Sequence, residues 1–199
     1  MRIQKKDKKM KKYISIMVLL SLFVIGCSEQ ASINSPVNTN TSEPNWIVLP
    51  KAEGMEINQI FSTSKLIDGK AGGSMLLNYS YNGGLFGKVT CSSSLQFPKG
   101  SFYEKITFTM THDDGLCVSS FMPGYQFNKV LTFNVRYTGI DFTGIDLANI
   151  GFAYIAADGS IEYAVNNGIN IDPRIGKIEV KDAKIPHFSR YGFVNKTYK

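Results

Sequence analysis

The chain has 199 residues, of which 22 are Lys or Arg and 16 are Asp or Glu, for a formal net charge of +6. Seven of these bases and one of these acids lie in residues 1–26, so residues 27–199 hold 15 of each and carry no net charge. Without a compact Lys/Arg cluster, this part lacks the electrostatic footprint of a nucleic-acid-binding protein, and its length suits one domain.

Residues 1–26 have the layout of an export signal, with a lysine-rich start and an apolar run over 14–25. The run is 12 residues long, whereas a membrane-spanning helix needs about 20, so we favour a cleaved signal over an uncleaved anchor. Val24-Ile25-Gly26-Cys27 resembles the bacterial lipobox. The resemblance implies cleavage before Cys27 and diacylglycerol on its sulfur. The protein would then be anchored in the cell membrane, or in the outer membrane if Ser28 is a sorting residue, with its domain facing the periplasm or the exterior.

After the predicted lipid attachment site, residues 27–45 are rich in Ser, Asn, Thr and Pro and contain no aromatic residue. Such a segment cannot bury enough apolar surface to offset its ordering entropy, so we predict a disordered tether. Trp46-Ile47-Val48-Leu49 then opens a single folded domain, which we expect over residues 46–199.

Apolar and polar side chains alternate with a period of two through this domain. In 130–137 the apolar members are Leu131, Phe133, Val135 and Tyr137, and the same alternation recurs in 75–81, 105–111 and 150–156. Turn sequences rich in Gly, Asn, Asp and Pro separate these stretches. Eight to ten short antiparallel strands predict an all-β fold, either a sandwich or an open barrel. Only 141–149 looks briefly helical.

Four short stretches carry a family resemblance. They are Ala71–Met75, Leu95–Phe102, Phe121–Lys129 and His187–Tyr191. In order and spacing they resemble the ZU-five-like domains of bacterial surface lipoproteins, ankyrins and netrin receptors. The resemblance covers roughly residues 60 to 194. It implies an antiparallel, immunoglobulin-like β-sandwich used mainly as a protein-interaction module, with no cofactor.

Two cysteines remain after the predicted anchor, Cys91 and Cys117. An exported protein meets oxidising conditions, which allows a disulfide between them. Buried free thiols, which pack as small apolar groups, are the other interpretation. Alternation places Cys91 on the inward face of its strand, whereas the position of Cys117 between Leu116 and Val118 favours neither face. The sequence leaves both interpretations open.

His187-Phe188-Ser189 is the sharpest catalytic candidate. The autoproteolytic relatives of the resembled family cut before the serine of such a triplet, with the hydroxyl attacking the preceding carbonyl and the histidine acting as base. The alternative places Phe188 in the core and His187 and Ser189 on the outside of the last strand. Only eleven residues follow the bond, so cleavage would release no domain. We therefore expect no catalytic activity.

Other polar clusters read better as turns than as sites. His112-Asp113-Asp114 contains side chains that can bind a metal ion. A metal site needs three or four convergent ligands, and with only two histidines in the chain the partners are missing, so we predict no metal site. Asp158-Gly159 and Asp172-Pro173 lack the acidic spacing of a calcium loop. The glycines of 83–87 lack the helix and Lys-Ser/Thr pair of a phosphate loop.

Most of the 10 Tyr and 13 Phe fall on inward faces, which predicts a core role. Tyr103, Tyr125 and Tyr163 lie near turns and could face a ligand. The sequence thus predicts a lipid-anchored envelope protein, without a cofactor, that contacts the membrane through its anchor. Its β-sandwich would meet an envelope protein or a glycan. The two alternatives are a self-processing domain and a carbohydrate-binding module with a row of exposed aromatic rings.

Overall fold

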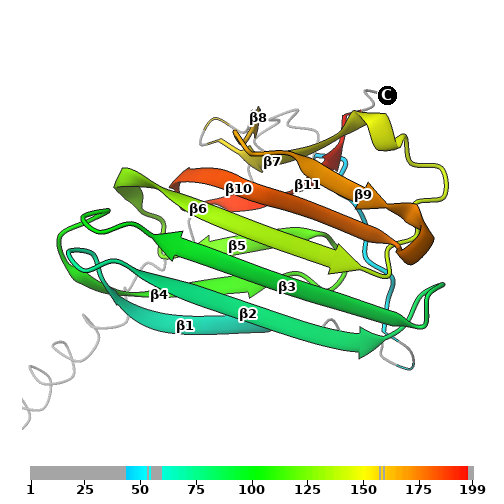
Figure 1. Cartoon of the computed structure of the whole chain (residues 1–199), viewed down its shortest axis with the longest axis horizontal. Helices are drawn as coiled ribbons and strands as arrows, with labels where there is room; N and C mark the ends of the chain where they lie inside the picture. The colour runs from blue at the N-terminus through cyan, green and yellow to red at the C-terminus, as the bar shows by residue number, and fades with distance from the viewer. Residues whose placement is uncertain (1–43, 53, 55–59, 157, 159, 197–199) are drawn as a thin grey trace, which may run out of the picture. The chain divides into compact units, whose positions relative to one another are not determined.

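The structure is a computed structural model that describes residues 44–52, 54, 60–156, 158 and 160–196. Two antiparallel sheets form the domain (Figure 1). The six-stranded sheet has the order β1 (Phe61–Asp68), β4 (Lys105–His112), β5 (Val118–Met122), β11 (Arg190–Asn195), β7 (Ile150–Ile155) and β8 (Ile161–Tyr163). The five-stranded sheet has the order β2 (Gly73–Asn82), β3 (Lys88–Phe97), β6 (Gln126–Thr138), β10 (Lys177–His187) and β9 (Ile169–Asp172).

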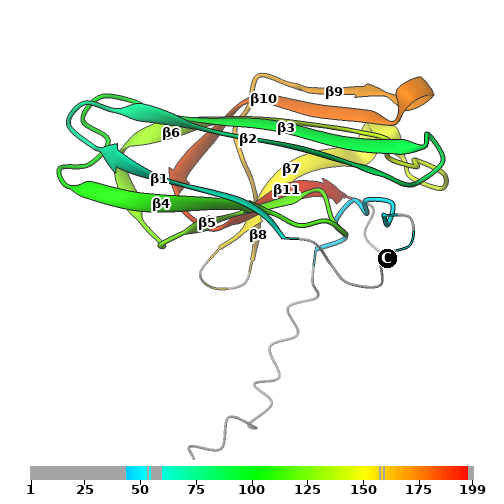
Figure 2. The ribbon, with the colours of Figure 1, turned by 90° about the horizontal axis from the view of Figure 1, so that it is seen from below.

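The two sheets lie face to face as separate layers, seen edge-on in Figure 2. Neither sheet closes on itself, so the predicted all-β antiparallel fold is confirmed and the sandwich, not the open barrel, is the observed form. Within the described ranges, none of the helical turns is long and apolar enough to cross a membrane. The predicted helical stretch over 141–149 reduces to one 3-10 turn at Leu147–Asn149, and a second lies at Pro173–Ile175.

The space between the sheets is filled by the apolar members of the alternating strands. On β6, Leu131, Phe133, Val135 and Tyr137 are all buried while Arg136 is exposed, as the period-two pattern predicts. Aromatic rings dominate one end of this core, mostly in edge-to-face contacts, which suit the charge distribution of the rings. That group comprises Phe97, Phe102, Phe108, Phe121, Phe127 and Phe188.

A second, smaller core lies on the outer face of the six-stranded sheet. Trp46 packs there against Val118, Ala153 and Val194. This packing covers Ala153 on the outer face of β7, which is buried on both faces although its alternation predicts a half-buried strand. The N-terminal segment is held by backbone hydrogen bonds on both sides, because Ile47 donates to Phe193 and accepts from Cys117.

Candidate functional site

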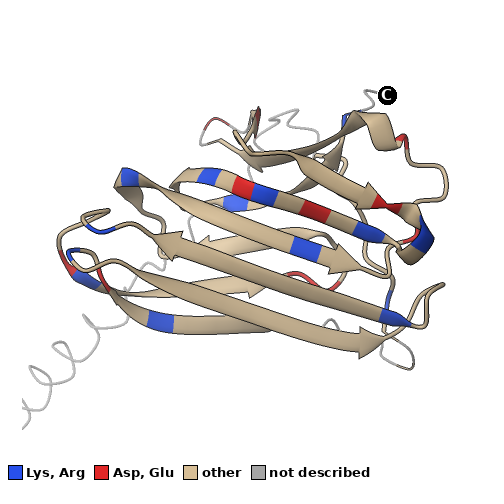
Figure 3. Cartoon of the chain, in the orientation of Figure 1, with Lys and Arg blue, Asp and Glu red and all other residues tan. Residues whose placement is uncertain are grey.

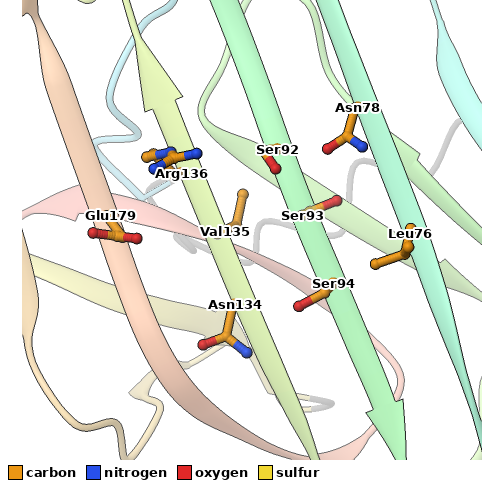
Figure 4. Close-up of a pocket in the computed structure, with 9 residues that line it drawn as sticks. All are labelled: Leu76, Asn78, Ser92, Ser93, Ser94, Asn134, Val135, Arg136 and Glu179. Atoms are coloured by element: carbon orange, nitrogen blue, oxygen red, sulfur yellow. The ribbon is translucent and has the colours of Figure 1, made fainter.

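The outer face of the five-stranded sheet carries a shallow depression, which we call the trough. Its outward-facing lining residues are Leu76, Asn78, Ser92, Ser94, Asn134, Arg136 and Glu179 (Figure 4). They come from four neighbouring strands, β2, β3, β6 and β10. The volume is about 210 Å³, below the range of roughly 300–1,000 Å³ typical of pockets that engulf a small molecule. The trough is therefore suited to part of a longer ligand.

Strand register places these side chains in rows across the sheet. Asn78 pairs with Ser92, Ser92 with Arg136, and Arg136 with Glu179, so these four residues form one row. Ser94 pairs with Leu76 on one side and with Asn134 on the other, forming a second row. Cross-strand partners on one face lie about 4.5–5.5 Å apart at Cβ, so the members of each row are neighbours.

The hollow shape follows from side-chain length. The central strand β3 contributes only serines to the rows, whereas the flanking strands contribute Leu, Asn, Arg and Glu. Short hydroxymethyl groups therefore form the floor, and longer side chains stand at the rim. Ser93, between them in sequence, points the other way into the core, because successive side chains of a strand alternate.

A β-bulge at the edge of the trough orients Asn134. The register of β10 against β6 shifts between Val180 and Ala183, and Asp182 within the shift has a φ of 51°, in the left-handed region that non-glycine residues rarely adopt. Its backbone N–H donates to Asn134 Oδ1 at 2.9 Å. The amide oxygen of Asn134 is thereby held, and the Nδ2 donors remain to face the trough.

The lining of the trough contains two opposite charges, Arg136 and Glu179. Arg136 and Glu179 are direct cross-strand partners, yet they are not among the ion pairs within 4.0 Å in the described part of the chain. Figure 3 shows acidic and basic residues alternating along β10, whereas β2 and β3 carry no charge except Lys88 at a strand end. The lining can therefore both donate and accept hydrogen bonds without attracting one sign of charge.

Sequence reasoning did not assign this site. The alternation places Thr132, Asn134 and Arg136 on one face of a strand, which reads as an ordinary solvated face. Cross-strand partners such as Ser92 and Arg136, or Arg136 and Glu179, are more than 40 residues apart in the chain, and nothing in a single sequence pairs them. A serine triplet, Ser92-Ser93-Ser94, is the one local signal, because serine is not a favoured strand residue.

His112, predicted at a polar hairpin tip, is fully buried between the sheets. Its Nε2 lies 2.7 Å from Ser93 Oγ, and its Nδ1 lies 2.9 Å from Ser119 Oγ and 3.2 Å from the Tyr137 hydroxyl. Burial lowers the pKa of His112 to about 4, and a backbone hydrogen bond with Val118 offsets only part of this effect. The imidazole is therefore neutral at pH 7 and acts as a hydrogen-bonding centre in the core.

The side chains of His112 and Asp113 point in different directions, which does not suit a shared metal ion. While His112 points inward, the carboxylate of Asp113 accepts from the backbone N–H groups of Gly115 and Leu116 at 2.8 and 3.1 Å, as in a turn. Among the residues that the structure describes, no group of three His, Cys, Asp or Glu side chains is placed to hold a metal ion.

Cys91 and Cys117 are buried free thiols, so the disulfide that the sequence left open is not formed in this structure. Cys91 faces inward, as its alternation predicts. Burial raises its pKa to about 12, although hydrogen bonds with Tyr137 and Tyr79 oppose the rise. Burial also raises the pKa of Cys117. Both sulfurs therefore pack as neutral apolar groups beside the hydroxyls around His112.

The His187-Phe188-Ser189 triplet lies where the chain passes from one sheet to the other. Phe188 is buried in the aromatic core, as the alternative to self-cleavage predicted, but His187 ends β10 and Ser189 lies between β10 and β11, so the two do not lie on the outside of the last strand. The Ser189 hydroxyl donates to the carbonyl oxygen of Ile155 at 3.0 Å. The His187 ring instead packs against Tyr154, with centroids 4.9 Å apart. A carbonyl oxygen cannot remove a proton, so this hydroxyl is not activated as a nucleophile in the observed arrangement.

The remaining candidates take up turn or packing roles. Asp158 accepts from the backbone N–H of Ser160, while Asp172 caps the turn that begins at Pro173 and pairs with Arg174 at 2.8 Å. Residues 83–87 form the hairpin between β2 and β3, closed by a bond from Gly87 N to Gly84 O.

The three turn tyrosines do not form one platform. Tyr103 is exposed in the β3–β4 loop, whereas Tyr125 donates to Glu104 and packs on Phe102. Tyr163 lies on the edge strand β8. The predicted attachment site Cys27, the signal over 1–26 and nearly all of the tether over 27–45 lie outside the described residues.

Fold and trough together define a β-sandwich with an open polar depression on one sheet. No protein-family profile, no curated protein and no solved structure matches this chain. The resemblance to ZU-five-like domains therefore stays a prediction from its four sequence stretches.

Proposed function

We propose that this protein is a lipid-anchored component of the cell envelope whose β-sandwich binds another envelope component and catalyses no reaction. The observation that carries the proposal is the trough, where Arg136, Glu179 and the two serines present hydrogen-bonding groups to solvent on a rigid sheet. Binding sites commonly combine a concave surface with a few well-placed polar groups, and strands hold such groups more precisely than loops do.

The titratable groups of the described domain support binding over catalysis. His112 is the histidine with hydroxyl partners on both ring nitrogens, but it is enclosed by the core and cannot meet a substrate. His187, which is partly exposed, packs against Tyr154 while the Ser189 hydroxyl is bonded elsewhere. The exposed polar groups of the trough include no cysteine or histidine, the side chains that most often serve as nucleophile or base near pH 7.

The sequence supports the anchored part of the proposal. Two acyl chains on Cys27 would give stable membrane attachment, since one chain alone binds only reversibly. A tether of about 18 residues would have a root-mean-square length of roughly 23 Å, enough to hold the sandwich away from the bilayer and close to other envelope components.

The anchor is tested by expressing the full chain and Cys27→Ser in a bacterial host and separating membranes from soluble material. We expect the wild type in the membrane fraction, shortened by its signal, and Cys27→Ser unprocessed. A Cys27→Ser chain that is processed normally and stays membrane-bound would refute the anchor.

The binding role is tested by chemical cross-linking in native envelopes. Ser92→Tyr fills the trough with a residue that suits strands, and Thr107→Tyr places the same side chain on the exposed face of β4 in the other sheet. We expect one cross-linked component with the wild type and Thr107→Tyr that is strongly reduced with Ser92→Tyr. Equal cross-linking yields with the wild type and both variants would show that the trough does not take part in binding.

A further inference from the structure

We infer that the trough binds the hydroxyl groups of a neutral glycan chain that lies across the five-stranded sheet. This inference rests on the proposed binding function and adds the chemical class of the ligand. Four features carry it: the mixture of donors and acceptors, the charge balance, the openness of the site and its position on a sheet face.

The donor and acceptor pattern matches sugar hydroxyls. Each hydroxyl both donates and accepts, so of two adjacent hydroxyls one can donate a hydrogen bond to Glu179 and the other accept one from Arg136 in the same row. Ser92, between Arg136 and Asn78, can play either role. Because Asn134 Oδ1 already accepts from the Asp182 backbone, the amide of Asn134 offers donors of fixed direction.

Within the lining of the trough the two charges do not favour an ionic ligand, although Lys177 and Lys181 flank Glu179 along β10. One guanidinium and one carboxylate are adjacent. An anion attracted by Arg136 is therefore repelled by Glu179, and a cation attracted by Glu179 is repelled by Arg136. A neutral polyhydroxylated ligand is repelled by neither group and can form hydrogen bonds with both. The exposed Leu76 at the rim, 61% accessible, can contact the apolar C–H face of a sugar ring.

The openness and position of the trough favour a glycan over a peptide. An extended peptide commonly binds by adding a strand to a free sheet edge, where it finds unpaired backbone groups. The trough instead lies over β3 and β6, which are both paired on two sides, so only side chains are available to a ligand. At about 210 Å³ it holds a short part of a chain, and further hydroxyls and amides continue along the same face. They belong to Ser74, Ser80, Thr90, Gln96, Thr132 and Thr138.

The test uses the full-length protein, purified from membranes in detergent, on an array of neutral oligosaccharides such as fragments of cellulose and of chitin. We expect binding to at least one glycan. Ser92→Tyr and Arg136→Ala should each weaken it about tenfold or more, while Thr107→Tyr should leave it unchanged. Glu179→Gln keeps the shape of the side chain but loses the charged acceptor, so it should weaken binding severalfold.

Two results would overturn the inference: no glycan bound by the wild type, or glycan binding that Ser92→Tyr does not reduce. Unfolding curves of each variant in urea, expected to be close to the wild type because these side chains are solvent-facing, separate loss of a site from loss of the fold. If cross-linking in envelopes still depends on the trough while no glycan binds, the ligand is not a glycan and the proposed binding function survives.

Discussion

His112 Nε2 lies 2.7 Å from Ser93 Oγ in the interior between the two sheets, joining β4 of one sheet to β3 of the other. Ser119 and Tyr137 complete the ring's hydrogen bonds on Nδ1. Burying a polar imidazole without hydrogen-bond partners would destabilise the fold, and the partners on both ring nitrogens offset that cost. The same arrangement fixes how the two sheets lie on one another, because misaligned sheets would leave these groups unpaired.

His112→Gln should destabilise the fold by about 1–3 kcal/mol, because a shorter amide cannot reach all three hydroxyls and leaves at least one buried polar group unpaired. The measurement is equilibrium unfolding in urea. Thr107→Gln on the solvent-facing side of the same strand is the matched control and should change the unfolding free energy by less than about 0.5 kcal/mol. Equal effects of the two substitutions would show that the His112 hydrogen bonds do not stabilise the fold.

Stability should decrease as the pH falls from about 6.5 to 4. His112 has a pKa lowered by burial to about 4, against an ordinary value of 6.5, so between these values the unfolded chain binds the proton more readily. The contribution is fully present above pH 6.5 and is lost as the pH falls toward 4, up to about 3 kcal/mol.

His112→Gln should flatten the pH dependence of the unfolding free energy within this window. The exposed carboxyls of Asp141, Asp158 and Asp172 also have lowered pKa values because of their hydrogen bonds. Their contributions are lost only below their ordinary pKa of 3.8, outside the window. A variant with an unchanged slope between pH 6.5 and 4 would show that another group titrates there.

Gly192→Ala should destabilise the domain by about 1–3 kcal/mol through overpacking. A Cβ on Gly192 would lie 2.7 Å from Val118 Cγ2 and 2.9 Å from Trp46 Cε3, inside the small core on the outer face of the sheet. Gly124→Ala is the control, because nothing lies within 4 Å of its added Cβ. Thermal unfolding of both variants measures the difference. A neutral Gly192→Ala would contradict the close packing of Val118, Trp46 and the Cys117 carbonyl, 2.8 Å from the added Cβ, around this glycine.

In the folded protein, Cys91 and Cys117 should react with a thiol reagent far more slowly than a free cysteine does. Both are buried, and burial raises their pKa values, which leaves little of the reactive thiolate at pH 8. In urea, protein purified from membranes should show two reactive thiols, since a lipidated Cys27 has none. Zero thiols in urea would reveal a disulfide between Cys91 and Cys117, and three would reveal an unmodified Cys27.

The chain should remain uncut at Ser189. Because the Ser189 hydroxyl donates to Ile155 and the His187 ring packs on Tyr154, the groups that cleavage requires are engaged elsewhere. Intact mass of the purified protein should show no loss of the last eleven residues, with Ser189→Ala differing only by its one oxygen atom. A fragment beginning at Ser189 in the wild type and absent from Ser189→Ala would establish self-processing.

The alternation of apolar and polar residues predicted much of the fold. The alternation through residues 130–137 identifies the inward side chains of β6, since a strand that is half buried must alternate. It identifies them less well for β7, where Ala153 is buried by Trp46 from a distant segment and Gly151 lies beneath Lys196 and Tyr163. Alternation reports which face a residue occupies but not what covers that face.

The sequence by itself determined the all-β class, most of the core and, as predictions still to be tested, the signal and the lipid attachment at Cys27. Only the tertiary structure decided that His112 is a buried hydrogen-bonding centre and that Asn78, Ser92, Arg136 and Glu179 form one row. The physical reason is that strand pairing is non-local. Side chains more than 40 residues apart, such as Ser92 and Arg136, become neighbours through backbone hydrogen bonds that have no local signature in sequence.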